Sequence, residues 1–268
     1  MMWDQHTHCE FSGDSTAPAR DMVQAAIDAG LEGICFTDHH DIDYPSTPDE
    51  DEFDINYDEY FPALKAVKEE FADRISVHIG VELGLQPHVG EKNAQFMQGK
   101  SFDFCIGSVH VIRGKDPYYG GFFDKLGEKE AFRAYFEDTI EGIRAFDGFD
   151  VLGHIGYLVR YAPNKRLNYH PSDYWDLIDI ILKTLIEKGK GIECNTSGYR
   201  GGLDCTIPGE EVLKRYKDLG GEIITIGSDA HRPEDVAMRF DVVKPLLTRC
   251  GFTHYAVFTA RKPEFFPL

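Results

Sequence analysis

The sequence predicts an α/β fold in which a parallel β-sheet closes into a barrel with helices outside it. Short apolar runs rich in β-branched residues alternate with longer helix-like segments, which is typical of parallel strands joined by helical crossovers. The chain has 268 residues, and one barrel of this kind commonly needs about 250. An open doubly wound sheet is the alternative, but no G-x-G-x-x-G loop follows the first expected strand.

Strands and helices are expected to alternate from end to end. The expected strands are the run that ends at His6 and residues 34–37, 76–81, 102–109, 150–153, 191–195, 222–226 and 255–258. The expected helices are residues 18–29, 57–71, 128–146, 172–187, 209–219 and 233–247. The acidic segment 41–58, which contains the run PDEDEFD, is expected to be an exposed loop. No linker or low-complexity segment divides the chain, so residues 1–268 are expected to form a single domain.

Composition and charge favour a cytoplasmic protein with a small ligand. No apolar run approaches the roughly 18 residues of a membrane-spanning helix, and the N-terminus lacks a signal-peptide pattern. The six cysteines form no C-x-x-C pair, as expected for reduced thiols of the cytosol. The net charge of −18 argues against long nucleic acid as a partner. It suits bound divalent cations or a cationic substrate, although solubility explains it equally well.

The ends of the expected strands carry the residues that indicate function. In chain order these are His6, His8, Asp38, His39, His40, Glu82, His110, His154, Glu193, Asp229 and His231. The C-terminal ends of all strands in a parallel barrel meet on one face, where active sites lie. A single histidine of this kind is as often a core residue as a ligand. Several independent candidates at one face favour a shared metal site.

The side chains themselves indicate a catalytic metal centre. Imidazole and carboxylate groups without thiolate suit Zn²⁺, Mn²⁺ or Fe²⁺ in a catalytic site. More than six candidate ligands are too many for one ion, so two or three divalent transition-metal ions are expected. The choice of metal is not encoded, because all three accept the same ligands.

The order of these motifs resembles that of the PHP (polymerase and histidinol phosphatase) superfamily. The resemblance rests on His6-x-His8, on Thr37-Asp38-His39, on a lone Glu82, on two separated histidines and on a late Asp-x-His, and it extends as far as His231. Length and flanking residues are most similar to the stand-alone histidinol-phosphate phosphatases. The resemblance implies a distorted (β/α)7 barrel. It also implies a phosphomonoesterase that converts L-histidinol phosphate to L-histidinol and phosphate in histidine biosynthesis.

The same resemblance implies a trinuclear centre. In such a centre the first ion is held by His6, His8, Glu82 and Asp229. Glu82 bridges to the second ion, which His110 and His154 complete. The third ion is held by Asp14, His39 and His231. Asp14 stands six residues after His8, where some relatives have histidine and others an acid.

Two arginines fit a phosphate-containing substrate. Arg160 lies in HIGYLVRY and Arg200 in NTSGYRGG, both in loops expected at the catalytic end. A guanidinium group binds phosphate oxygens in pairs, so these residues are expected to clamp the substrate phosphate. Glu193 is expected to bind the cationic end of histidinol phosphate.

The expected reaction is attack on phosphorus by a hydroxide that bridges the first two ions. The third ion and the two arginines would stabilise charge on the phosphoryl oxygens. The leaving alkoxide needs a proton, which Asp229 or His231 would supply. Asp38 is expected to orient a neighbouring metal ligand.

Three other functions are compatible with parts of this pattern. A related phosphoesterase would act on a small nucleotide or a phosphodiester. A carbon–nitrogen amidohydrolase also uses His-x-His and a late Asp, but no bridging lysine stands at a matching strand end. A metal-binding scaffold without activity is the third. The oligomeric state is left open by the sequence.

Overall fold

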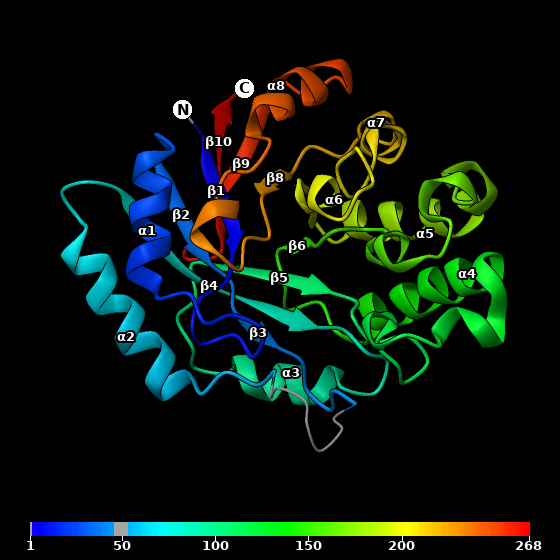
Figure 1. The fold of residues 1–268 in the computed structure, drawn as a ribbon, viewed down its shortest axis with the longest axis horizontal. Helices are drawn as coiled ribbons and strands as arrows, with labels where there is room; N and C mark the ends of the chain where they lie inside the picture. The colour runs from blue at the N-terminus through cyan, green and yellow to red at the C-terminus, as the bar shows by residue number, and fades with distance from the viewer. Residues whose placement is uncertain (1, 46–52) are drawn as a thin grey trace.

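In the computed structural model, which describes residues 2–45 and 53–268, the strands of the main sheet lie side by side in chain order. They are β1 (Trp3–Thr7), β2 (Gly33–Phe36), β4 (Ser76–Gly84), β5 (Phe104–Ser108), β6 (Val151–Leu152), β7 (Gly191–Asn195) and β8 (Ile224–Gly227). A short strand, β3 (His39–His40), pairs with β4. Every pairing in this sheet is parallel. The expected α/β fold is confirmed (Figure 1).

The sheet closes into a barrel between its first and last strands. The backbone N–H of Asp229 donates to the carbonyl oxygen of His6, and that of His8 donates to Ala230, both at 2.8 Å. Gly227 allows this close approach, because a Cβ there would overlap His6 Cβ and Glu193 Oε1. Closure therefore places His6 and His8 beside Asp229, although more than 220 positions separate them in the sequence.

Helices lie around the outside of the barrel (Figure 1). They are α1 (Ala19–Asp28), α2 (Tyr57–Glu70), α3 (Gly90–Met97), α4 (Phe122–Ala145), α5 (Trp175–Glu187), α6 (Ser197–Arg200), α7 (Glu210–Asp218) and α8 (Phe240–Arg249). In α5 the buried residues Ile178, Ile181, Leu182 and Leu185 recur at helical spacing and form its inward face. No helix in the described ranges has the length and apolar character of a membrane span.

The helix expected at residues 233–247 is interrupted. A 3-10 turn, η5 (Pro233–Asp235), comes first, and α8 begins only at Phe240. Between them Ala237 and Arg239 adopt positive φ values of 56° and 60°, which end a right-handed helix. The backbone N–H of Ala237 donates to Asp4 Oδ2 at 3.0 Å. A long-range bond to β1 thus replaces a bond within the expected helix.

The last expected strand does not join the parallel sheet. It forms β9 (His254–Thr259), which pairs antiparallel with the unexpected β10 (Lys262–Pro267). Ala256 and Phe258 pack against Phe104 at the start of β5, and the two phenyl rings stack at 5.0 Å. Gln5 Nε2 donates to the Ala256 carbonyl at 2.6 Å. The hairpin therefore closes the N-terminal end of the barrel and leaves the other end to polar side chains.

Candidate metal centre

A cluster of imidazole and carboxylate groups fills the C-terminal end of the barrel. His6 lies in β1, His39 in β3 and Glu82 in β4, while the other members follow strand ends: His8, Asp14, His110, His154, Asp229 and His231. All are buried except Asp14, which is exposed, and His231, which is half-buried. β4 runs three residues further than expected because β3 pairs with it, opposite Glu82. The structure brings together all nine residues expected to bind metal.

The four residues expected at the first ion lie together. Glu82 Oε2 is 3.3 Å from His6 Nε2 and 3.6 Å from His8 Nε2. Asp229 Oδ1 is 3.4 Å from His8 Nε2 and 3.7 Å from His6 Nε2. Two ring nitrogens and two carboxylate oxygens thus converge on one point, which is the donor set of a four-coordinate site.

The other oxygen of Glu82 faces the second set. Glu82 Oε1 is 2.9 Å from His154 Nε2 and 3.4 Å from His110 Nε2. One carboxylate therefore offers a different oxygen to each of two neighbouring sets. This arrangement suits a carboxylate that bridges two ions.

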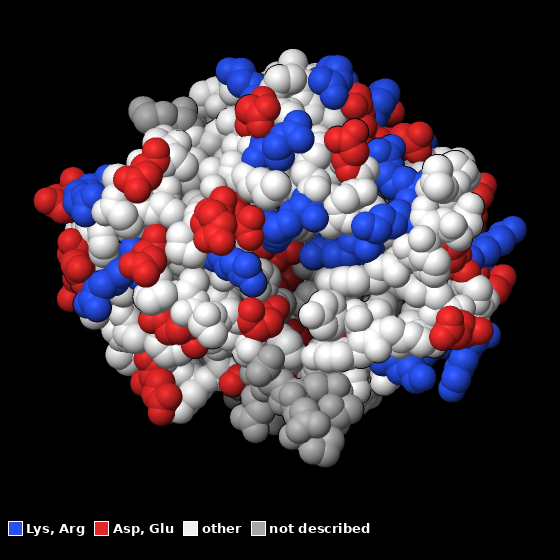
Figure 2. Space-filling view, viewed as in Figure 1, with Lys and Arg blue, Asp and Glu red and all other residues white. Residues whose placement is uncertain are grey.

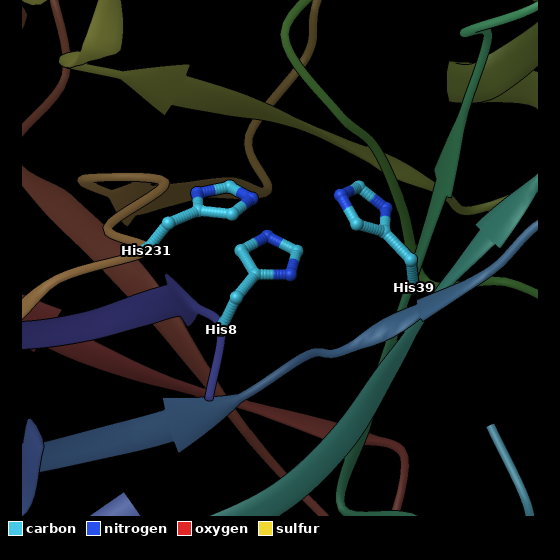
Figure 3. Close-up of side chains that lie close together, drawn as sticks. All are labelled: His8, His39 and His231. Atoms are coloured by element: carbon cyan, nitrogen blue, oxygen red, sulfur yellow. The ribbon is translucent and has the colours of Figure 1, made fainter. Parts of the chain in front are cut away.

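The third set lies nearer to solvent. Asp14 Oδ2 is 3.0 Å from His231 Nε2 and 3.6 Å from His39 Nε2. His231 Nδ1 donates to the Asp229 carbonyl oxygen at 3.0 Å, which leaves the lone pair of Nε2 facing Asp14. Figure 3 shows the rings of His8, His39 and His231 turned toward one another from just after β1, from β3 and from the loop after β8. These side chains are close enough to share an ion.

Buried carboxylates hold two of the histidines in the form that binds metal. His6 Nδ1 lies 2.7 Å from Glu193 Oε1, and His110 Nδ1 lies 3.0 Å from Asp41 Oδ1. An ionised carboxylate only accepts hydrogen bonds, so each Nδ1 carries the proton and each Nε2 keeps its lone pair. Both Nε2 atoms face Glu82.

The protein alone leaves part of this cluster without hydrogen bonds. Among the described residues, His6 Nε2, His8 Nε2 and Glu82 Oε2 are buried and have no hydrogen-bond partner. Buried polar atoms are costly unless they are paired. Metal ions would satisfy these atoms, and the donor types suit Zn²⁺, Mn²⁺ or Fe²⁺. The residues present therefore fit a multinuclear metal centre.

The charges within the cluster favour ionised carboxylates. Burial alone would raise the pKa of Glu82, but His6, His110 and His39 together hold it well below its usual value. Burial alone would lower the pKa of His6, whereas Glu193, Glu82 and Asp229 raise it well above 6.5. Without an ion the His6 ring would therefore hold a second proton on Nε2, which a bound metal ion would displace. Glu82 is therefore available as an anionic ligand at neutral pH.

The cluster opens to solvent through a cavity of about 450 Å³. Figure 2 shows a hollow on this face, with basic side chains gathered along part of its rim and acidic atoms at depth. Among the described residues, five carboxylates and three arginines line the cavity, together with an aromatic wall: Asp14, Asp41, Asp116, Asp229 and Asp235; Arg160, Arg200 and Arg232; Tyr44, Phe53, Tyr118, Tyr119, Tyr157 and Tyr161. A small polar molecule that reached the metal-binding residues would pass between these side chains.

A family model, the PHP domain, matches residues 4–197. The chain belongs to the PHP family. The match covers the strands from β1 to β7 and most of the metal-binding cluster. The resemblance seen in the motifs is thereby confirmed.

Similar PHP proteins extend over nearly the whole chain. It is 32% identical over 260 residues to the histidinol-phosphatase of Lactococcus lactis, covering 97% of this chain and 95% of that one. It is 31% identical to the probable histidinol-phosphatase of Clostridium acetobutylicum, covering 99% and 97%. A crystal structure of the histidinol phosphate phosphatase of Lactococcus lactis, complexed with zinc, L-histidinol and phosphate, superimposes with a TM-score of 0.88 at 31% identity, covering 98% of each chain.

Both arginines expected in this PHP site line the cavity. Arg160 Nη2 lies 3.2 Å from Asp229 Oδ2 and 3.1 Å from Ser197 Oγ. Arg200 Nη2 donates to the Asp229 carbonyl oxygen at 2.5 Å, and its Nε lies 3.7 Å from Asp235 Oδ2. The two side chains thus flank Asp229, and Arg200 also supports the backbone there, where φ is 56°.

The structure corrects the expectation for Glu193. Its side chain is 1% exposed and does not line the cavity. Oε1 contacts His6, while Oε2 accepts hydrogen bonds from the His154 backbone N–H and the Asn195 amide, both at 3.0 Å. Glu193 therefore has no oxygen directed at a substrate. It positions His6 and the loop that carries His154.

Asp38 also lies outside the cavity. Asp38 Oδ1 accepts from the Cys9 backbone N–H at 2.7 Å, and burial raises the pKa of Asp38 to about 6. Ser12, which lies 2.9 Å from His8 Nδ1, also bonds to Asp38. Asp38 precedes His39 in the chain and contacts His8 indirectly through Ser12, and it does not line the cavity.

Asp41 is the residue at the centre that sequence reasoning missed. It was expected in an exposed acidic loop, but its side chain is 2% exposed, and its carboxylate faces His110 Nδ1 and, at 3.5 Å, His39 Nδ1. The signal was present, because His39-x-Asp41 repeats the two-residue spacing of His6-x-His8. Phe53, from the other end of the same segment, lines the cavity. Residues 48–52 of the PDEDEFD run lie outside the described residues.

Proposed function

We propose that this PHP protein is a histidinol-phosphatase, which hydrolyses L-histidinol phosphate to L-histidinol and phosphate. The supporting observation is that three sets of metal-binding side chains and two arginines face one small cavity. The full-length similarity to histidinol-phosphatases and the superposition on a structure with zinc, L-histidinol and phosphate support this substrate.

We propose two or three divalent ions as cofactors, with Zn²⁺, Mn²⁺ and Fe²⁺ as candidates. His6, His8 and Asp229 would hold the first ion. Glu82 would bridge it to a second at His110 and His154, and Asp14, His39 and His231 would hold a third. Ions in these positions would supply positive charge for the phosphoryl oxygens and lower the pKa of water.

Different side chains around the cavity would bind different parts of the substrate. Arg160 and Arg200 would bind the phosphoryl oxygens and stabilise charge there as the phosphorus–oxygen bond breaks. The cationic end of histidinol phosphate would face Asp116, which lines the cavity beside its aromatic wall. The leaving alkoxide takes up a proton, and Asp229 and His231 are the candidates that line the cavity. Asp229 is ionised, so it would first take this proton from the attacking water and then pass it to the alkoxide.

The whole chain would act as one unit. We propose that residues 1–268 form a single catalytic domain, because side chains from β1 to the loop after β8 contribute to the same site. All six cysteines are free, which supports a cytoplasmic location, where thiols stay reduced.

The decisive experiment measures phosphate release by the purified, metal-analysed protein. With Zn²⁺ or Mn²⁺ added, we expect kcat/KM for L-histidinol phosphate above about 10⁴ M⁻¹s⁻¹, the low end of the usual enzyme range. Nucleoside monophosphates and a bis-phosphodiester form the comparison panel. Faster turnover of any of these by a metal-loaded protein would show that a different phosphoester is the substrate.

A further inference from the structure

Three arginines line the cavity, and two of them pair with other residues that the structure describes. Arg160 is paired with Asp229, and Arg200 with the Asp229 carbonyl and Asp235. Arg232 also lines the cavity, and its side chain is exposed. Among the described residues, the Arg232 guanidinium has no hydrogen-bond or ion-pair partner. Its donors are therefore free to meet a ligand.

The backbone at Arg232 is firmly held. His231 precedes it, and the His231 carbonyl oxygen accepts a hydrogen bond from Ser15 Oγ at 2.9 Å. Pro233 follows and restricts Arg232 to an extended conformation, observed as φ −147° and ψ 150°. The Arg232 side chain thus starts from a fixed point at the edge of the metal-binding cluster.

The negative charge of the protein is a reason for a cationic side chain at the position of Arg232. The chain has a net charge of −18, and three described carboxylates that are not expected to bind metal, those of Asp41, Asp116 and Asp235, line the cavity. A doubly charged phosphate approaching this surface meets repulsion before it reaches Arg160 or metal ions at depth. Exposed charges act over about 10 Å at ordinary ionic strength. The exposed guanidinium of Arg232 at the cavity wall would offset this repulsion before the phosphate reaches Arg160.

We propose that Arg232 captures the phosphate group of the incoming substrate and passes it to Arg160 and Arg200. This inference rests on the proposed function in one respect only, that the substrate carries a phosphate. Arg232 acts on binding and not on the chemical step. Its removal therefore raises KM and leaves kcat unchanged, and the effect depends on salt.

The test compares Arg232→Gln with Arg232→Lys and with Arg20→Gln in the metal-loaded protein. Arg20 is exposed and pairs with Glu70 on the helical surface, so its substitution makes the same change in net charge away from the cavity. At low salt we expect Arg232→Gln to lower kcat/KM for L-histidinol phosphate about three- to fivefold, the size of a solvent-exposed charge pair. Arg232→Lys and Arg20→Gln should stay close to wild type. At roughly 0.5 M salt the deficit should disappear.

Binding of inorganic phosphate, measured by calorimetry, gives a second readout that does not depend on turnover. We expect Arg232→Gln to weaken it by a similar factor. A loss of kcat at unchanged KM, a loss that salt does not reduce, or an equal loss in Arg20→Gln would overturn the inference. If wild type fails to hydrolyse histidinol phosphate but Arg232→Gln still weakens phosphate binding, the proposed function fails and the role of Arg232 stands. Unchanged phosphate binding overturns that role.

Discussion

At the scale of single residues, Glu193 links two histidines of the candidate metal centre to the barrel wall. One oxygen contacts the His6 ring and the other accepts from the His154 backbone. A carboxylate in this position fixes the ring orientation and raises the basicity of the nitrogen that binds metal. We therefore expect Glu193 to act on metal affinity rather than on the substrate.

Glu193→Gln should weaken metal binding by about 10- to 100-fold, the usual effect of removing such a partner. At saturating metal, KM for histidinol phosphate should stay near the wild-type value. Metal affinity is measured by competition with a chromogenic chelator. Glu187→Gln, an exposed change at the far end of α5, is the matched control. A raised KM with unchanged metal affinity would instead restore the substrate role first expected for Glu193.

At the scale of elements, His40 joins β3 to α3. Its ring stacks on Phe96 at 3.6 Å and is buried. Burial lowers the pKa of His40 to about 4, with Asp41 opposing this shift and Lys100 adding to it. Asp54 lies 3.4 Å away but is 57% exposed, so solvent screens its charge. His40 therefore stays neutral at physiological pH.

His40→Phe should flatten the dependence of stability on pH. The folded protein binds the His40 proton more weakly than the unfolded chain does, so the free energy of unfolding falls as pH drops from about 6.5 toward 4. Between pH 7.5 and pH 5 the wild type should lose roughly 2 kcal/mol more than the variant. Urea titrations of both proteins at the two pH values measure this. Any metal lost at low pH affects wild type and variant alike, so it does not contribute to the difference between them. An equal loss in both would refute the pKa assignment.

At the scale of the whole molecule, the candidate metal centre lies where the first and last strands of the main sheet meet. His6 and His8 come from the first strand, and Asp229 and His231 follow the last. Ions held between them would bind the folded chain and not the unfolded one. Metal binding should therefore stabilise the closed barrel.

Chelation should lower the thermal midpoint by roughly 10 °C. This corresponds to about 4 kcal/mol, expected when the free metal concentration is 1,000 times its dissociation constant. Calorimetry with and without chelator measures the shift, and restoring Zn²⁺ or Mn²⁺ should reverse it. An unchanged midpoint would mean that the cluster does not bind ions tightly.

Most of the barrel was predictable because its signals are local. Apolar runs, helix periodicity and strand-end polar residues are read within a few positions. The secondary-structure predictions are wrong where contacts between residues distant in the sequence determine the local conformation. The helix expected at 233–247 breaks because the Ala237 N–H bonds to Asp4 in β1, and residues 254–259 form a hairpin strand because they pack into the barrel interior. The role of Asp41 was not predicted because an acidic run in a sequence usually indicates a solvent-exposed loop.

The sequence by itself determined the alternation of strands and helices, the family and the nine candidate metal ligands. These follow from residue types at strand ends, which every parallel barrel gathers on one face. Only the tertiary structure decided that Glu193 is buried behind His6, that Asp41 faces His110, and that Arg232 lines the cavity with no partner among the described residues. Those roles depend on which side chains from other strands occupy the same space, and spacing along one chain does not contain that information.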